Sequence, residues 1–259
     1  MKALVGDIGN TVTKICLVEI STLKIKKKIY FKSRNIPSFC FLKKNLKKII
    51  KSKNVYKVAL FSSVVPKYQF ILSKYLKKNY KIKLREIKEK NIKKIIKINI
   101  KDKNQVGSDR IANAVGVYKR YKLNCIVLDF GTATTFDVVT KDGIYNGGII
   151  APGVNLSLKS LVNSADQISV FSIKKQNKIV GKNTVEALRS GFYWGYVGLI
   201  NNILLKIEKE TKKKKYKVIF TGGYADLFKT SIKRPFTIDK HITIKGIIEI
   251  FRENIKNLN

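Results

Sequence analysis

Three short polar turns that contain glycine stand out in this sequence, because each one directly follows an apolar stretch. They are Asp7–Thr11 (DIGNT), Asp129–Thr135 (DFGTATT) and Thr221–Tyr224 (TGGY). Glycine has no Cβ, so the backbone of such a turn can approach a ligand closely, and successive N–H groups can form a cradle for an anion. Each turn alone is common in hairpins, but the three together, in this order, predict a binding site for ATP.

The side chains of these turns suggest different parts in binding a nucleotide. Asp7 would repel a phosphate group, so its natural partner is Mg²⁺ or a water molecule bound to the metal. Thr132 can donate a hydrogen bond to a phosphate oxygen. Gly222 and Gly223 leave room for a flat adenosine group to lie against the backbone.

A fourth polar segment, Val106–Asn113 (VGSDRIAN), begins a helical pattern and allows two interpretations. Ser108 and Asp109 can simply cap the helix and favour its dipole. Alternatively, Asp109 accepts the proton of an attacking hydroxyl group, while Arg110 and the helix N-terminus hold an anion. An aspartate with a pKa of about 3.9 is a weak base for an alcohol, but positioning and charge neutralisation carry most of the rate of phosphoryl transfer. The segment alone leaves both interpretations open.

The chain is strongly basic, with a formal net charge of +37 over 259 residues. Most of its basic residues are lysines spread among isoleucine and asparagine, and only seven are arginines. Specific recognition of nucleic acids depends on arginine forks and aromatic platforms, and neither is concentrated here. We therefore expect no specific nucleic-acid partner.

Cysteine content and hydropathy bound the remaining classes. The cysteines Cys16, Cys40 and Cys125 lack metal-ligand spacing, so we expect them to be small buried hydrophobic residues. No segment is long and apolar enough for a secretory signal or a membrane span, which predicts a soluble, cytoplasmic protein with no membrane partner.

Strands and helices must position the polar turns, and apolar spacing predicts where they lie. Strands are expected on both sides of the first two turns, before the third turn, and at residues 25–31, 58–62 and 144–151. Helices are expected at residues 39–50, 69–76, 108–121, 152–162, 184–210 and 244–255. The order strand, Asp-x-Gly turn, strand occurs at Asp7 and again at Asp129, which predicts two similar lobes.

Three glycines fall within the predicted helix at 184–210. Gly191, Gly195 and Gly198 are spaced i, i+4 and i+7, so they share one face. Each costs about 1 kcal/mol relative to alanine. Close approach of a neighbouring helix would offset this cost; the alternative is that the helix breaks there.

Taken together, the motifs resemble those of the type III pantothenate kinases, which catalyse the first step of coenzyme A synthesis and share the fold of sugar kinases, Hsp70 and actin. The resemblance extends from Asp7 to about Ile248. It rests on DIGNT (7–11), VGSDRIANAVG (106–116), LDFGTATTFDVV (128–139), YNGGIIAPG (145–153), GKNTVEALRSG (181–191) and TGG (221–223). It implies an α/β protein of two ribonuclease H-like lobes, residues 1–117 and 118–259, each a mixed sheet flanked by helices, with ATP in the cleft between them.

The resemblance also implies a role for each matching residue. The residues implied to bind ATP are Asp7, Ile8, Gly9, Asn10, Thr11, Val12, Thr13, Lys14, Thr132, Gly222 and Gly223. Those implied to bind pantothenate are Gly107, Ser108, Asp109, Arg110 and Thr184, with Asp109 as proton acceptor and Arg110 at the substrate carboxylate. Asp129 would help to bind a monovalent cation, K⁺ or NH₄⁺, alongside Mg²⁺ or another divalent cation. The family's active site lies at a homodimer interface, so Thr184 would serve the partner's site.

The chain departs from the family pattern in two places. Ile100 and Lys103 stand where the family has a pocket tyrosine and a proline, and Gln167-Ile168 replaces Leu-Pro. These changes affect the shape of the pocket and remove no group that the chemistry needs.

Three other functions are compatible with parts of the sequence. They are an ATP-binding regulator of the same fold that has lost catalysis, a kinase for another small alcohol, and a basic nucleic-acid-binding protein. Retention of Asp109, Arg110, Asp129 and Thr184 argues against the first. The missing tyrosine is the best argument for the second, and charge alone suggests the third.

Overall fold

The computed structural model describes residues 2–50, 55–165, 171–212 and 215–255, and the chain divides into two compact units. Unit 1 consists of Met1–Lys122, Val139–Gly147 and His241–Asn259, and unit 2 of Leu123–Val138 and Gly148–Lys240. The sequence predicts contiguous lobes instead, 1–117 and 118–259. The division differs because the last helix, α6 (Ile242–Asn254), packs against α3 (Ser108–Tyr121) and returns the end of the chain to unit 1.

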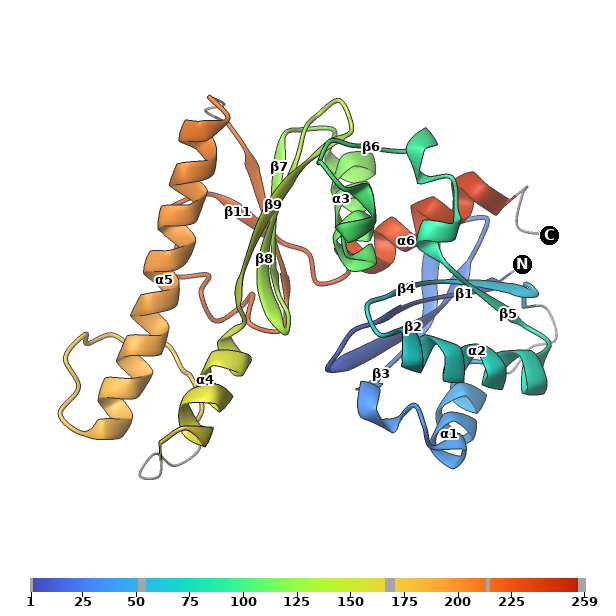
Figure 1. Cartoon of the computed structure of the whole chain (residues 1–259), viewed down its shortest axis with the longest axis horizontal. Coiled ribbons are helices and arrows are strands. Elements are labelled where there is room, and N and C mark those ends of the chain that lie inside the picture. Colours follow the sequence, from blue (N-terminus) through green and yellow to red (C-terminus); the bar gives the residue numbers. More distant parts are fainter. Residues whose placement is uncertain (1, 51–54, 166–170, 213–214, 256–259) are drawn as a thin grey trace. The chain divides into compact units, whose positions relative to one another are not determined.

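Unit 1 contains a five-stranded mixed sheet in the order β3-β2-β1-β4-β5 (Figure 1). Its strands are β1 (Lys2–Ile8), β2 (Val12–Glu19), β3 (Lys24–Lys32), β4 (Val58–Ser63) and β5 (Lys83–Glu86). Strand β1 is antiparallel to β2 and parallel to β4. The short strand β6 (Lys97–Ile98) pairs with the start of β9 (Ile144–Pro152).

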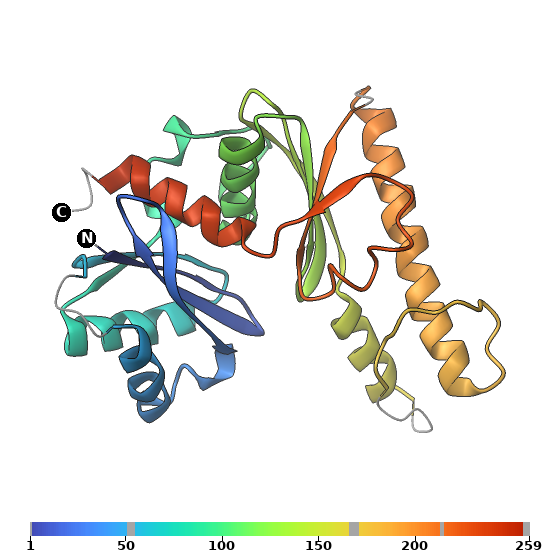
Figure 2. The ribbon, with the colours of Figure 1, turned by 180° about the vertical axis from the view of Figure 1, so that it is seen from behind.

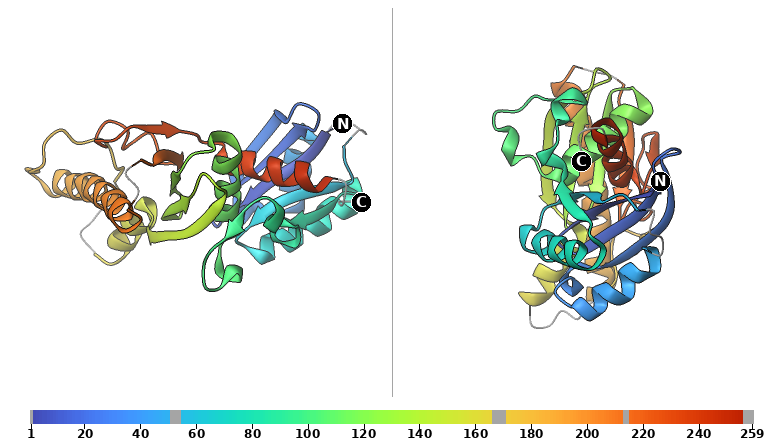
Figure 3. Two further views of the ribbon diagram at one scale, coloured as in Figure 1. Left: turned by 90° about the horizontal axis from the view of Figure 1, so that it is seen from above. Right: turned by 90° about the vertical axis from the view of Figure 1, so that its right-hand side faces the viewer.

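Helices cover both faces of this sheet (Figures 1 and 3). The helices α1 (Phe39–Ile49) and α2 (Pro66–Tyr80) pack on the face that carries Leu4, Ile8 and Phe61. Side chains alternate along a strand, so Asp7 and Ser62 belong to the opposite face, where α3 and α6 pack. Both α1 and α2 carry lysines in their last turn, where a positive charge interacts favourably with the helix dipole and stabilises the helix.

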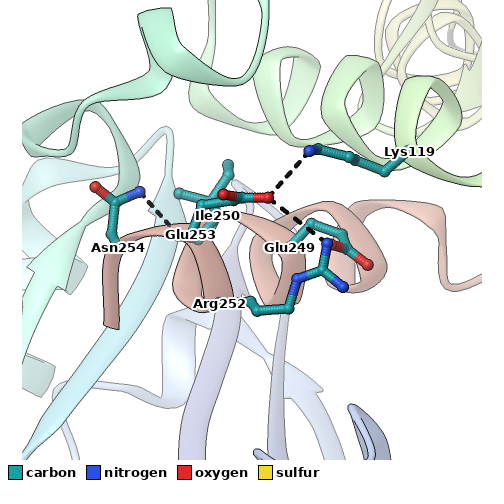
Figure 4. A network of polar contacts seen from close by, with 6 residues as sticks. All are labelled: Lys119, Glu249, Ile250, Arg252, Glu253 and Asn254. Carbon is teal, nitrogen blue, oxygen red and sulfur yellow. Dashed lines mark hydrogen bonds and ion pairs between the residues drawn. The ribbon is translucent and has the colours of Figure 1, made fainter. Parts of the chain in front are cut away.

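Helices α3 and α6 cross at unusually close range in unit 1. A Cβ added at Gly246 would overlap the carbonyl oxygen of Ala112, and one added at Gly116 would meet the backbone of Ile242. A buried hydrogen bond of 2.7 Å from Thr243 Oγ1 to Asn113 Oδ1 joins the helices. At the surface, Lys119 and Arg252 both contact the Glu253 carboxylate (Figure 4).

Unit 2 repeats the strand order of unit 1. Its strands are β7 (Cys125–Phe130), β8 (Ala133–Val139), β9, β10 (Lys217–Gly222) and β11 (Phe236–Ile238), in the order β9-β8-β7-β10-β11. This order matches β3-β2-β1-β4-β5, so the predicted internal repeat is confirmed. The fold class is therefore α/β, with two mixed sheets and flanking helices.

One long helix covers a single face of the sheet in unit 2. This helix, α5 (Thr184–Glu210), packs on Phe130, Phe136 and Phe220, and Figure 2 shows it running beside the strands. Asn183 caps it by accepting a hydrogen bond of 2.9 Å from Glu186 N. The preceding helix, α4, spans Val154–Asn163. The predicted helix start at residue 152 is wrong, because Pro152 still belongs to β9.

The structure also tests two further expectations, that the cysteines are buried and that no segment spans a membrane. Cys16 and Cys125 are buried as predicted, but Cys40 is exposed because α1 buries the face that carries Leu42, Leu46 and Ile49. Burial raises the pKa of Cys16 to about 11 and that of Cys125 to about 12. Within the described ranges, no helix has the length and apolar character needed to cross a membrane.

Candidate active site

The first polar turn joins β1 to β2 in unit 1. Gly9 N donates a hydrogen bond of 3.2 Å to Val12 O, which closes the hairpin, and Asn10 and Thr11 are exposed at its tip. Asp7, the residue before last in β1, is half-buried. Val12 is exposed at the start of β2, whereas Thr13 is fully buried and Lys14 half-buried, so the exposed part of the predicted segment lies at residues 10–12.

The Asp109 segment meets the same end of this sheet. Ser108 Oγ donates a hydrogen bond of 2.8 Å to Ser63 O and accepts one of 2.9 Å from Ser63 N. Ser63 is paired with Ile8, and Ser62 with Asp7, in the parallel register of β1 and β4. Asp7 and Asp109 are thus brought to the same edge and the same side of the sheet, although 102 residues separate them in sequence.

The predicted role of Ser108 as a helix cap is wrong. The N-cap of α3 is Gly107, which has no side chain to cap with, and Ser108 is the first helical residue. Its hydroxyl instead holds the end of β4, so Ser108 anchors the helix start to the sheet. Asp109 Oδ1 accepts a hydrogen bond of 2.8 Å from Arg110 N.

The environment of Asp109 changes the acid–base argument. Burial raises the pKa of the Asp109 carboxyl group above its ordinary value of 3.8, while the Arg110 backbone N–H and the Arg110 charge act in the opposite direction. A raised pKa makes the ionised carboxylate a stronger base than an exposed aspartate. The local structure therefore strengthens the proton-acceptor interpretation.

Arg110 lies over an aromatic ring that the sequence did not point to. Its guanidinium carbon is 5.9 Å from the centre of the Tyr145 ring, and Tyr145 is fully buried. A cation held over a ring face gains electrostatic attraction and loses freedom. Gly147, two residues after Tyr145, has a φ of +86° and lies against Ile100. Ile100, the residue in the place of the family's tyrosine, therefore borders this segment of unit 1.

The second and third turns lie side by side in unit 2. Strands β7 and β10 are parallel, with Asp129 opposite Thr221 and Phe130 opposite Gly222. Gly223 N donates a hydrogen bond of 3.0 Å to Phe130 O. Both turns are therefore at the carboxyl ends of adjacent strands, where ligands bind in open α/β sheets.

The glycines of these turns serve two different purposes. Gly222 has a φ of +86° and no room for a Cβ, because the Phe130 backbone fills that space. Gly153 is likewise packed on the carbonyl group of Thr132. Gly223, in contrast, has nothing within 4 Å of an added Cβ, so it presents open backbone to a ligand.

Metal ligands are sparse in the structure. Among the described residues, no three His, Cys, Asp or Glu side chains form a metal cluster. Mg²⁺ in nucleotide sites needs only one or two carboxylates, because phosphate oxygens and waters complete its shell, and Asp7 fits that pattern. Asp129 faces the same side of the sheet as the buried hydroxyl of Thr221, which has no hydrogen-bond partner in the described part of the chain. Carboxylate and hydroxyl oxygens are the kind of ligands that a hard cation prefers.

Thr184 begins α5 and borders an apolar groove of about 640 Å³ in unit 2. The groove runs between α4 and α5, and its lining includes Ser157, Leu161, Leu188, Gly191 and Gly195. Helix α5 is continuous through its three glycines, so the predicted alternative of a helix break is wrong. Among the residues that the structure describes, no atom lies within 4 Å of a Cβ added at any of the three. The departure Gln167-Ile168 lies outside the described residues.

Comparison with known proteins agrees with the motif blocks. A family model described as type III pantothenate kinase matches residues 3–206. A type III pantothenate kinase of Pelagibacter ubique is 50% identical over 245 residues, covering 95% of this chain and 96% of the relative.

Solved structures show the fold. A conserved Campylobacter jejuni protein assigned to the Baf family of transcriptional activators has a TM-score of 0.62 at 20% identity, covering 98% of this chain and 99% of that one. MreB 5 of Spiroplasma citri, bound to AMPPNP, has a TM-score of 0.56 at 12% identity, covering 99% and 97%.

Proposed function

The chain belongs to the type III pantothenate kinase family, and we propose that it transfers the γ-phosphoryl group of ATP to the 4′-hydroxyl group of pantothenate, giving 4′-phosphopantothenate and ADP. The observation that carries the mechanism is the pair of hydrogen bonds between Ser108 and Ser63, which brings Asp109 to the sheet edge where Asp7 lies near the end of β1. The proposal places this reaction in the cytoplasm, since it consumes ATP.

The site residues of unit 1 each have a defined part in the proposed reaction. Asp109 accepts the proton of the attacking hydroxyl group, and burial raises its pKa toward the range useful for a base. Arg110, held over Tyr145, binds the substrate carboxylate. The exposed backbone of residues 10–12 cradles phosphate, and Asp7 holds Mg²⁺, which neutralises the phosphate charge when bound.

Unit 2 supplies further groups to the nucleotide and the monovalent cation. Thr132 donates to a phosphate oxygen, and Gly223 offers open backbone for the adenosine group. Asp129 holds K⁺ or NH₄⁺, supported by the hydroxyl of Thr221 beside it in the sheet.

The proposal includes a homodimer in which α5 and the groove beside α4 contact a second copy. Three glycines form one face of α5, and no atom of the described residues lies within 4 Å of a Cβ added at any of them. Val185, Leu156 and Leu161 expose large apolar side chains nearby. A second copy of the chain packs on this face. Its contacts offset the low helix propensity of the three glycines, and its Thr184 completes the site.

An assay with matched acceptors tests this function. Purified protein with ATP, Mg²⁺ and K⁺ should release ADP with pantothenate and far less with pantothenol, which replaces the carboxylate by an alcohol and cannot pair with Arg110. Equal turnover of both compounds would contradict the role of Arg110. Turnover of a different small alcohol, but not of pantothenate, would contradict the proposed substrate.

A further inference from the structure

A buried serine outside every predicted motif contacts the first turn. Ser33 follows directly after β3 and begins a short 3-10 helix, Ser33–Asn35. Its side chain is fully buried, and its hydroxyl donates a hydrogen bond of 2.6 Å to Gly9 O. Its backbone N–H donates a second bond of 2.9 Å to Thr11 O. One residue therefore holds the carbonyl groups on both sides of Asn10.

A second buried hydroxyl fixes the direction of this contact. Thr13 Oγ1 lies 2.8 Å from Ser33 Oγ, and both side chains have no exposed area. A carbonyl oxygen can only accept, so the single hydroxyl proton of Ser33 goes to Gly9 O. Thr13 must then be the donor to Ser33. The result is a directed chain from Thr13 to Ser33 to the Gly9 carbonyl group.

This chain sets the orientation of one peptide group in the turn. The bond between Gly9 and Asn10 is trans and planar, so its C=O and N–H point in opposite directions. Because Ser33 holds the carbonyl oxygen toward the protein interior, the Asn10 N–H points away from Ser33, at the exposed tip of the hairpin. A donor that is already oriented costs no reorganisation when an anion binds.

We infer that Ser33 is a positioning residue for the nucleotide: through Gly9 it aims the Asn10 N–H at a phosphate oxygen of ATP, and Thr13 holds Ser33 in the donating orientation. This inference rests on the proposed function of the first turn as the phosphate cradle. It also gives Thr13 a structural role. The Thr13 side chain has no exposed surface, so it cannot contact ATP directly.

The test measures binding of Mg²⁺–ATP by calorimetry, without pantothenate, beside steady-state kinetics. Ser33→Ala leaves the Gly9 carbonyl without its partner and should weaken ATP binding about tenfold. The KM for pantothenate should change less than twofold. Thr13→Val should weaken ATP binding less, by about threefold, and the double variant should be no worse than Ser33→Ala, since both act through one hydroxyl.

A matched control separates positioning from general loss of stability. Ser38 lies five residues further on and caps α1 by accepting a hydrogen bond from Phe41 N, and it is exposed. Ser38→Ala should therefore lower the melting temperature but leave ATP binding unchanged, whereas Ser33→Thr, which keeps the hydroxyl, should bind ATP nearly as the natural protein does.

The outcomes distinguish this inference from the proposed function. A folded Ser33→Ala variant that binds ATP as tightly as the natural protein overturns the inference alone. Should that variant not fold, Thr13→Val decides, and an unchanged ATP dissociation constant overturns the inference. A natural protein that binds ATP, responds to Ser33→Ala and does not phosphorylate pantothenate would refute the proposed reaction and support the role of Ser33.

Discussion

At the scale of single residues, burial and charge around Asp109 and Arg110 decide the chemistry. Asp109 would be a poor base in water, and its position at the buried start of α3 raises its pKa. Arg110 is not simply a surface cation, because Tyr145 lies beneath its guanidinium group. In the proposed reaction, both side chains would therefore meet the substrate in a restricted orientation, which is worth more to a reaction than charge alone.

The partly buried carboxylate of Asp109 predicts that stability and catalysis oppose each other at this position. Because the folded pKa of Asp109 is raised, the fold prefers its neutral form, and the associated stability is lost as the pH rises through the folded pKa. Asp109→Asn should therefore melt at a higher temperature than the natural protein at pH 7.5. This difference in melting temperature should vanish below about pH 4, where the Asp109 carboxyl group is neutral in both the folded and the unfolded protein. Thermal denaturation at several pH values checks this, and a less stable variant at pH 7.5 would argue against a buried ionised Asp109.

The carboxylate partner of Arg110 predicts a selective kinetic effect. Arg110→Ala should raise the KM for pantothenate about 100-fold, the value of a lost charge-assisted contact, and leave ATP affinity within about twofold. Arg120→Ala is the matched control. Arg120 lies on the same helix, α3, over the Tyr121 ring, but it is exposed and lies in the last turn of the helix. Similar effects of the two changes on KM would contradict a specific role for Arg110.

Residue roles could be predicted from the sequence only where a local motif carries them. Asp109 and Arg110 follow a recognisable turn, and the structure brings Asp109 to the sheet edge of Asp7. Ser33 and Ser63 gave no signal, because their partners lie 24 and 45 residues away in sequence. Tyr145 begins one of the motif blocks, but its contact with Arg110 is known only from the fold. A serine in a basic loop looks the same whether it holds a carbonyl group or faces water.

At the scale of elements, two sets of glycines behave in opposite ways. The spacing of the three glycines of α5 predicts packing against a helix, but in the described part of the chain a Cβ added at any of them meets no atom within 4 Å. Gly116 and Gly246, which drew no attention in the sequence, sit where α3 and α6 touch. Periodic spacing shows that glycines share a face, but only the fold shows whether that face is covered within one chain.

The crossing of α3 and α6 predicts a large loss of stability from one methyl group. Gly246→Ala would push a Cβ into the carbonyl oxygen of Ala112, and backbone atoms cannot move aside as a side-chain end can. We expect a loss of about 2 kcal/mol or more in the free energy of unfolding, although alanine favours helices. Urea denaturation measures it.

Gly198→Ala is the control for this prediction at the level of the protomer. A Cβ added at Gly198 meets no atom within 4 Å among the described residues, so this substitution should not destabilise the folded protomer through a clash. Equal destabilisation of the two variants at a concentration where the protein is monomeric would contradict the packing argument.

At the scale of the whole molecule, the repeated strand order explains why similar turns recur. The orders β3-β2-β1-β4-β5 and β9-β8-β7-β10-β11 each place an Asp-x-Gly turn between a central strand and its antiparallel neighbour. The repeat was visible in the sequence as two similar turns. The return of α6 to unit 1 was not, because it depends on contacts such as Thr243 with Asn113, 130 residues apart.

The proposed dimer predicts complementation between two defective chains. Thr184 is exposed in the first turn of α5, where a carboxylate favours the helix dipole, so Thr184→Glu should fold and repel the anionic substrate. Asp109→Asn, made in the other chain, removes the proton acceptor that this chain contributes to its site. In mixed dimers, one of the two sites carries neither change.

Mixing the two inactive variants after dissociation should therefore restore about a quarter of natural activity, since about half of the dimers are mixed and each has one intact site. Each variant's mass in solution is measured first to confirm that it assembles. Two variants that both form dimers but regain no activity on mixing would show that Thr184 serves its own chain's site.

The most direct test of the account is the pantothenate-dependent release of ADP by the natural protein and by Asp109→Asn, with ATP, Mg²⁺ and K⁺ at saturating concentrations. The account predicts turnover that requires pantothenate in the natural protein. In the variant it predicts a fall of at least about 100-fold in kcat, with ATP still bound. Pantothenate-dependent turnover that survives in the variant would reduce Asp109 to an element of the helix start. A natural protein that binds ATP but shows no such turnover would contradict the proposed reaction itself.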